Sequence, residues 1–376
     1  MTWNDEPISG ALAALEALLE RRARDSCDEV SHYPTPIARC DVQLTCLIEQ
    51  RDHYLARLRA LRANDVASLI AGRAWPQDEE ERAMVERLET TIATEETRLI
   101  SLGTRRLALT RSGYGSPVIV LEAGLGAESS EWRDVQRTLA AHARVCRYDR
   151  AGRGASDAAV SPRRPADLVA DLHTLLHRAE LAPPYVLVGH SFGGLLVRLF
   201  AQRHRAEVSG VVLVDAMHPD QFAVFGRAFP PPCVGEPTAL REMRQFWSGG
   251  WREPRSTREG IDLVAACAQA RATTSLGDLP IHVLSAGTFL RQPLIPEALR
   301  PRLQDQWDGL QRTFLMLSSR TTLTRVETSG HFIQREAPQA VVAAVVEVLA
   351  AAREATVTSS DTLGHRRRRG SSGSAR

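Results

Sequence analysis

A five-residue motif between an apolar run and a helix-forming run restricts the folds open to this chain. Residues 185–188 are apolar, the motif Gly-His-Ser-Phe-Gly occupies residues 189–193, and an apolar helical segment follows at once. Small residues two positions on either side of the serine are needed where strand, strained turn and helix crowd together. The starting helix directs its positive end and a backbone N–H toward the serine. The motif therefore predicts a strand–turn–helix unit with Ser191 as candidate nucleophile.

Further apolar runs flank this unit and alternate with helix-length segments such as residues 165–180. Alternation of buried strands with helices predicts an α/β fold with a mostly parallel sheet covered on both faces. Residues 336–354 predict a last amphipathic helix. The predicted strands occupy residues 105–111, 117–121, 145–148, 208–214 and 281–285.

The two ends of the chain have other patterns. Within residues 1–103, apolar residues recur at spacings of three and four, which predicts a helical hairpin module whose last helix ends at Gly103. Such a module suits packing or homo-oligomerisation. The second domain is expected over residues 104–354 and should stand largely alone. Residues 355–376 are rich in Ser, Thr, Gly and Arg, and we expect a disordered tail there.

Composition argues against several classes of protein. The formal charge of +2, from 47 basic and 45 acidic residues, is too small to indicate nucleic-acid binding. The run Arg366–Arg369 could touch RNA or an acidic surface, although a solvated tail is the simpler interpretation. The six cysteines form no CxxC pair, which favours reduced thiols. No apolar run reaches about 18 residues, and the N-terminus lacks the basic region of a signal peptide, so we expect a cytoplasmic protein.

Several segments, in order, resemble the alpha/beta hydrolases of the esterase-like branch. They are the strand and oxyanion loop at 116–129, the strand and Asp-Arg-x-Gly-x-Gly-x-Ser loop at 145–157, and the segments 185–194, 208–220, 279–287 and 329–338. The resemblance covers residues 104–354 and implies the α/β-hydrolase fold. Many relatives have His-Gly in the oxyanion loop, where this chain has Ala123 and Gly124. Main-chain groups donate there, so the expected oxyanion donors are the N–H groups of Leu125 and Phe192.

The resemblance implies a catalytic triad in the order serine, acid, histidine. His331, in the Ser-Gly-His-Phe loop before the final helix, is the candidate base. Asp215 ends the apolar run of the strand after the nucleophile helix and is the candidate acid, as in relatives such as the haloalkane dehalogenases. Alternatively, Asp215 only caps its strand. The other acids considered are Asp220, the nearest substitute, and the later Glu297, Asp305 and Asp308.

A helical cap insert is expected over residues 219–278, which is longer than a simple crossover needs. Such an insert covers the active site in this superfamily. Its aromatic side chains would form either an apolar pocket and lid or the core of the cap itself, and both interpretations stay open. They are Phe222, Phe225, Phe229, Phe246, Trp247 and Trp251.

Two motifs suggest cofactors but are incomplete. His173 and His177 share a helical face, but the Glu of HExxH is absent and no third ligand is evident, so no metal site is predicted. The Gly-x-Gly pairs at 124–126 and 152–154 lack the third glycine of a dinucleotide loop. We therefore expect no metal and no organic cofactor. His190, next to the serine, is expected to be structural.

These patterns together favour a serine hydrolase of small carboxylic esters or lactones. Ser191 would form an acyl-enzyme, His331 would move the proton, and water would release the acid. The same triad would also serve an acyltransferase that passes the acyl group to an alcohol or amine. A non-catalytic ligand-binding protein on the same fold is the third alternative.

Overall fold

The structure is a computed structural model that describes residues 3, 5–33, 41–63, 65–229, 231–288 and 297–369. It contains two compact units. The first comprises Met1–Glu96, Arg111–Gly115 and Arg137–Val145, and the second comprises the rest of the chain. The predicted boundary near residue 103 therefore falls close to the end of the helical segment. However, two short segments from beyond that boundary belong to the helical unit.

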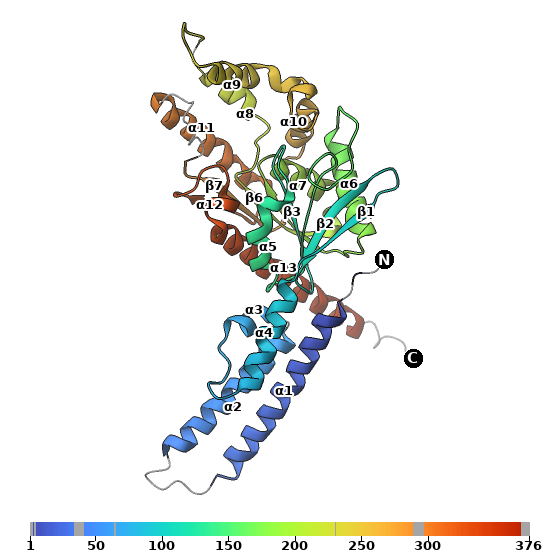
Figure 1. Cartoon of the computed structure of the whole chain (residues 1–376), viewed down its shortest axis with the longest axis vertical. Helices are drawn as coiled ribbons and strands as arrows, with labels where there is room; N and C mark the ends of the chain where they lie inside the picture. The colour runs from blue at the N-terminus through green and yellow to red at the C-terminus, as the bar shows by residue number, and fades with distance from the viewer. Residues whose placement is uncertain are drawn as a thin grey trace. The chain divides into compact units, whose positions relative to one another are not determined.

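Four helices build the first unit, and the two longest, α1 and α2, pack along each other (Figure 1). The buried side of α1 is apolar because leucines repeat at helical spacing, and Leu15 and Leu19 are fully buried, as is Leu88 of α4. Asp78 starts α4 by accepting a hydrogen bond from the N–H of Glu81 at 3.0 Å. Tyr54 also donates to Asp78, at 2.8 Å. The helices are α1 (Glu6–Ser31), α2 (Asp41–Arg62), α3 (Val66–Ala71) and α4 (Glu79–Ala93).

The prediction that helix continues to Gly103 is wrong. Helix α4 ends at Ala93, and Glu96–Ser101 forms strand β1, whose residues alternate between half-buried and exposed. This two-residue period and the β-branched Thr97 and Ile100 suit a strand at the edge of a sheet. Gly103 adopts φ +102° in the turn that leads to the next strand. A left-handed turn needs glycine, so this residue ends a strand rather than a helix.

The sheet has eight strands in the order β1-β2-β4-β3-β5-β6-β7-β8. The pairs β3–β5, β5–β6, β6–β7 and β7–β8 are parallel. Every residue of β3, β4, β5 and β7 is buried, so both faces of the centre are covered, as predicted. The strands are β2 (Arg106–Ser112), β3 (Val118–Glu122), β4 (Val145–Tyr148), β5 (Tyr185–His190), β6 (Val208–Val214), β7 (Ile281–Ala286) and β8 (Thr321–Val326).

Strand β8 was not predicted from the sequence. Its residues, Thr-Thr-Leu-Thr-Arg-Val, are mostly polar, and only Val326 is buried. An edge strand needs few apolar side chains because one long side faces solvent. Consequently the apolar run at β7, expected to be the last strand, is followed by one more, and the His331 loop leaves β8 rather than β7.

Helices cover the sheet and the carboxyl ends of its strands. Helix α7 packs on β3, β5 and β6, α13 packs on β5, β6 and β7, and α6 and α10 pack on α7 (Figure 1). Between β6 and β7 lies the helical insert that the sequence predicts as a cap. The helices are α5 (Arg133–Leu139), α6 (Pro165–Arg178), α7 (Phe192–Arg203), α8 (Gln221–Ala228), α9 (Thr238–Ser248), α10 (Leu263–Ala272), α11 (Arg300–Thr313), α12 (Ile333–Glu336) and α13 (Pro338–Arg369).

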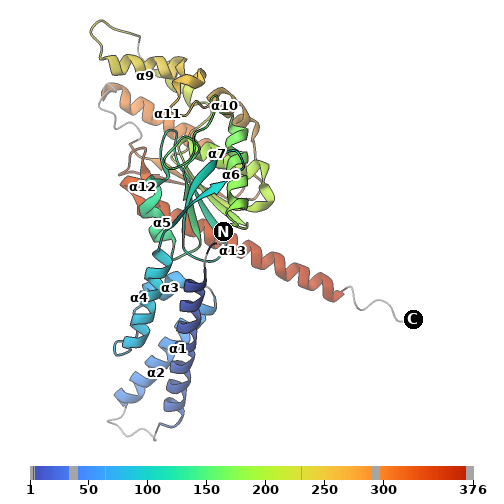
Figure 2. The ribbon, with the colours of Figure 1, turned by 45° about the vertical axis from the view of Figure 1, so that its right-hand side comes forward.

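The last helix runs further than the sequence predicts. Instead of ending near residue 354, α13 continues to Arg369 and extends past the sheet (Figure 2). The expected disordered tail is therefore helical over residues 355–369. Residues 370–376, the rest of the predicted tail, lie outside the described residues. Within the described chain, no helix is long and apolar enough to span a membrane.

Asp5 forms ion pairs within the first unit whose contribution to stability can be measured. Its carboxylate lies 3.0 Å from the guanidinium of Arg111 and 2.5 Å from that of Arg144. Arg111 is buried and its other carboxylate partner, Glu96, lies further away at 3.5 Å, so removing the charge of Asp5 leaves the guanidinium less well compensated. We predict that Asp5→Asn lowers the free energy of unfolding by about 1–3 kcal/mol in urea titrations. Asp52→Asn, at an exposed site, is the matched control, and equal stability of the two variants would contradict the role of Asp5.

Candidate active site

Ser191 is the single residue between the end of β5 and the start of α7. Its backbone has φ +53°, a left-handed conformation that few side chains tolerate. The turn is held by two backbone hydrogen bonds: the N–H of Ser191 donates to the carbonyl of Val214 at 3.1 Å, and its carbonyl accepts from Met217 at 2.8 Å. The strain is thus maintained by the neighbouring strand β6 and the chain that follows it.

The glycines of the motif have no space for a side chain. A Cβ at Gly189 would lie 2.5 Å from the carbonyl oxygen of Gly193, and one at Gly193 would lie 2.4 Å from that of Glu122. Real Cβ atoms do not approach backbone so closely, so the strand, turn and helix meet only if these positions are glycine. The crowding predicted from the motif is present, and it presents Ser191 at the N-terminus of α7.

Asp215 and His331, 116 residues apart in sequence, form a direct pair. Oδ2 of Asp215 lies 2.6 Å from Nδ1 of His331. Oδ1 accepts hydrogen bonds from the N–H of Ala286 at 2.8 Å and from Nε1–H of Trp307 at 2.7 Å. With Asp215 fully buried, these contacts fix both the carboxylate plane and the imidazole. A carboxylate at Nδ1 favours the tautomer with a proton there and a lone pair on Nε2.

The other acids considered have different surroundings. Asp220 pairs with Arg271 at 2.7 Å. Asp308 accepts from Gln304 at 2.7 Å and lies 3.3 Å from Arg325. Asp305 lies in α11, and Glu297 begins the short helical turn Glu297–Leu299 before it. Of these candidates, it is Asp215 that contacts the imidazole of His331.

Ser191 and His331 line one cavity of about 280 Å³. Leu125 and Phe192, which carry the expected oxyanion donors, line it as well. Among the described residues, neither of these two N–H groups donates to a protein acceptor. Unused donors beside a nucleophile are what stabilisation of a developing oxyanion requires. The remaining lining residues come mostly from the insert and α11: Met217, Gln221, Phe222, Met243, Phe246, Trp247, Leu263, Trp307 and Phe332.

The aromatic side chains of the insert fill both roles left open by the sequence. Phe222, Phe246 and Trp247 line the cavity. Trp251 stacks on Phe222 with ring centroids 4.4 Å apart, and Phe225 belongs to a buried core cluster with Trp307. The insert therefore uses part of its aromatic set as its own core and presents the rest to the cavity.

A buried charged network lies under the oxyanion loop. The guanidinium of Arg150 contacts the carboxylates of Glu122 and Glu259, each at 2.5 Å, and donates to the carbonyls of Ala123 at 2.7 Å and Gly124 at 2.6 Å. Burial raises the pKa of Glu122 despite this partner. Burial would also raise the pKa of Glu259, but Arg150 holds it below its usual value. The network fixes the loop that carries Leu125.

Glu259 extends this network from the insert to the loop, because its Oε1 accepts the N–H of Gly126 at 2.6 Å. Sequence reasoning missed the network. The only local signal was an acidic residue, Glu122, directly after the apolar run 117–121. A charge at the end of a buried strand needs a partner, but nothing in the sequence identifies Arg150 and Glu259 as that partner.

His190 packs against His331 and forms a hydrogen bond with its backbone. Its Nε2 lies 2.9 Å from the backbone carbonyl of His331, and the two imidazole centroids are 4.7 Å apart. Burial, and then the nearby His331, hold the pKa of His190 well below its usual value. The ring is therefore neutral and donates its Nε2–H, which fits the structural role expected for it.

Comparison with known families agrees with this architecture. Residues 117–259 match the sequence model of a family described as alpha/beta hydrolase fold. The matched part includes Ser191 and Asp215 and ends before His331. Together with the parallel sheet and the strand–turn–helix at Ser191, the match shows that this part of the chain has the alpha/beta hydrolase fold.

Individual relatives are similar at moderate identity. The chain is 27% identical over 242 residues to the uncharacterized protein YqjL of Bacillus subtilis, a match that covers 64% of this chain and 87% of YqjL. It is 29% identical to the uncharacterized protein C23C11.06c of Schizosaccharomyces pombe, covering 53% of this chain and only 39% of that protein. A crystal structure of a hydrolase from Pseudomonas aeruginosa is 20% identical with a TM-score of 0.47, covering 68% and 98% of the two chains.

His218 gives the stability of the fold a predictable dependence on pH. Its Nδ1 accepts the N–H of Asp220 at 3.1 Å, and its Nε2 lies 2.9 Å from Oγ1 of Thr313, so a second ring proton would face a donor. Burial lowers its pKa to about 4. The unfolded chain, with a histidine pKa near 6.5, binds this proton first, so stability is lost as pH falls from about 6.5 to about 4.

We predict that His218→Gln reduces the slope of unfolding free energy against pH in this window by about 1.4 kcal/mol per pH unit. Urea titrations at closely spaced pH values measure the slope. His32→Gln, at an exposed position ending α1, should leave it unchanged. An unaltered slope in His218→Gln would mean that this imidazole is protonated equally in the folded and unfolded states.

Proposed function

We propose that this chain is a serine hydrolase that cleaves small carboxylic esters or lactones through an acyl-enzyme on Ser191. The observation that carries the proposal is the 2.6 Å contact between Asp215 and His331, because His331 and Ser191 line the same cavity. A nucleophile at a helix N-terminus, an oriented imidazole and two unused backbone donors form the set that acyl transfer needs.

The catalytic steps follow from these roles. Ser191 Oγ attacks the ester carbonyl while Nε2 of His331 takes its proton, and Asp215 stabilises the resulting imidazolium. The N–H groups of Leu125 and Phe192 bind the oxyanion of the tetrahedral intermediate. His331 then protonates the leaving alcohol. Water, activated by the same imidazole, releases the acid and restores Ser191.

The cavity supports a small, largely apolar substrate. Its volume of about 280 Å³ is below the range of about 300–1,000 Å³ typical of ligand pockets. The side chains of Phe222, Phe246 and Trp247 suit a short acyl or alkyl group rather than a charged one. A panel of short esters, long esters and lactones would define the preference, and added alcohol acceptors would reveal acyl transfer as an alternative fate of the acyl-enzyme.

Replacement of the nucleophile is the first test. We predict that Ser191→Ala lowers kcat for short p-nitrophenyl esters by about 10⁴–10⁶ without altering the circular dichroism spectrum. Alanine removes the attacking oxygen and leaves the turn intact. A fluorophosphonate probe should label the folded wild type at Ser191. Activity within tenfold of wild type in the variant, or no labelling and no ester turnover in the wild type, would favour the non-catalytic binding protein.

The acid is tested by a substitution that keeps its shape. In Asp215→Asn, the amide oxygen can still accept from Ala286 and Trp307, so its –NH₂ faces Nδ1 of His331. That arrangement forces Nδ1 to accept and puts the proton on Nε2, where it blocks general-base action. We predict a fall in kcat of about 10²–10⁴ with little change in stability.

Asp308→Asn is the control for this experiment, because Asp308 pairs with Gln304 and Arg325. It should retain nearly full activity. If Asp215→Asn kept wild-type kcat while Asp308→Asn, Asp305→Asn or Glu297→Gln abolished it, the acid would belong to the later segment.

A further inference from the structure

Three imidazoles and a carboxylate converge at the end of α7 opposite to Ser191. His173 and His177 lie one turn apart on α6, His204 follows α7, and Glu207 ends the short helical turn Arg205–Glu207 before β6. Helix α7 has 12 residues, so at 1.5 Å per residue the cluster lies about 18 Å along the helix from the candidate nucleophile. It is therefore separate from the active-site cavity.

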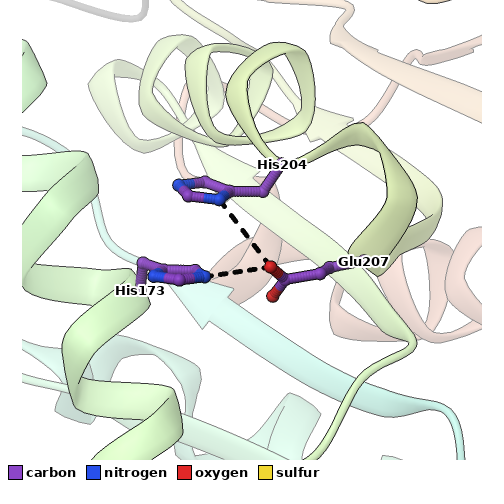
Figure 3. A group of neighbouring side chains, drawn as sticks. All are labelled: His173, His204 and Glu207. Atoms are coloured by element: carbon purple, nitrogen blue, oxygen red, sulfur yellow. Dashed lines mark hydrogen bonds and ion pairs between the residues drawn. The ribbon is translucent and has the colours of Figure 1, made fainter.

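The ligand atoms of His173, His204 and Glu207 all lie within 4.8 Å of one another, and His177 adds a nitrogen close to two of them. Nε2 of His173 lies 3.0 Å from Oε1 of Glu207 and 3.1 Å from Nε2 of His177. Nε2 of His177 lies 3.5 Å from the other carboxylate oxygen, and Nδ1 of His204 lies 3.8 Å from Oε1. Figure 3 shows the rings of His173 and His204 beside the carboxylate, and they stack with centroids 3.9 Å apart, so one ring must turn before both can bind one ion. In a tetrahedral zinc site with bonds of about 2.0–2.1 Å, ligand atoms are about 3.3 Å apart.

Glu207 has a buried carboxylate oxygen that is free to bind a cation. Its Oε1 lies 3.0 Å from Nε2 of His173, but its Oε2 has no hydrogen-bond partner among the described residues. A cation at this point would bind that oxygen together with lone pairs of the neighbouring imidazoles.

We propose that His173, His177, His204 and Glu207 bind one Zn²⁺ ion as a structural site. Four protein ligands complete a tetrahedron and leave no open position for a substrate, so the ion would clamp α6 to the connection between α7 and β6. The sequence shows only the His173–His177 pair, because the other two ligands come from another element and meet the pair only in the folded chain.

The full chain, stripped with a chelator and titrated with ZnCl₂ against a chromophoric competitor, tests this proposal. We expect one Zn²⁺ per chain and, at about 100 times Kd, a rise in Tm of about 3–4 °C. His177→Gln should weaken binding at least tenfold. His177 is exposed, so its replacement does not threaten folding, and Glu207→Gln provides a second test.

Two control variants separate this site from other imidazoles. His331→Gln removes the active-site imidazole and His32→Gln removes an exposed one, and both should keep the stoichiometry and the Tm shift. The absence of stoichiometric binding to the wild type would overturn the proposal. Unchanged affinity in both His177→Gln and Glu207→Gln, or loss of binding in His331→Gln, would also overturn it.

Discussion

Close packing of backbone on backbone around Ser191 is the constraint on which the rest of the site depends. Strand β5, the turn and α7 meet so closely that Gly189 and Gly193 have no space for a Cβ. This packing holds the backbone of Ser191 at φ +53° and places its side chain at the start of α7. Ser191 donates its N–H to Val214 and accepts the N–H of Met217, which ties the turn to β6, and Asp215 directly follows β6. One crowded junction therefore positions two of the three candidate catalytic side chains.

Burial and full hydrogen bonding make the remaining groups rigid. Asp215 is saturated by a backbone N–H, an indole N–H and an imidazole, which allows a buried carboxylate to exist and leaves it one orientation. Arg150 holds the oxyanion loop in one conformation, because its guanidinium contacts two carboxylates and donates to two carbonyls of the loop region. Because Glu259 comes from the insert between β6 and β7, the loop and the insert share this network. The shape of the cavity and the position of its donors are thus coupled.

Sequence patterns predict those features that depend on neighbours in the chain. The turn at Ser191, the apolar central strands and the positions of Asp215 and His331 follow from motifs and their order along the chain. Strands β1 and β8 were missed because edge strands need few apolar residues, and helical spacing continued by coincidence to Leu99. Arg150, Glu259, His204 and Glu207 could not be assigned from sequence, because each acquires its role from residues far away in the chain. Their chemistry exists only after folding.

The most direct test of the account is carbamoylation with a p-nitrophenyl carbamate, whose carbamoyl-enzyme is released slowly. If Ser191 is the nucleophile, the folded chain releases one p-nitrophenol per molecule and loses esterase activity in parallel. Mass spectrometry then finds the carbamoyl group on the peptide that contains Ser191, and Ser191→Ala neither releases p-nitrophenol nor gains mass. Inactivation with the carbamoyl group on another side chain, or ester hydrolysis that continues after Ser191 is fully modified, would contradict the account.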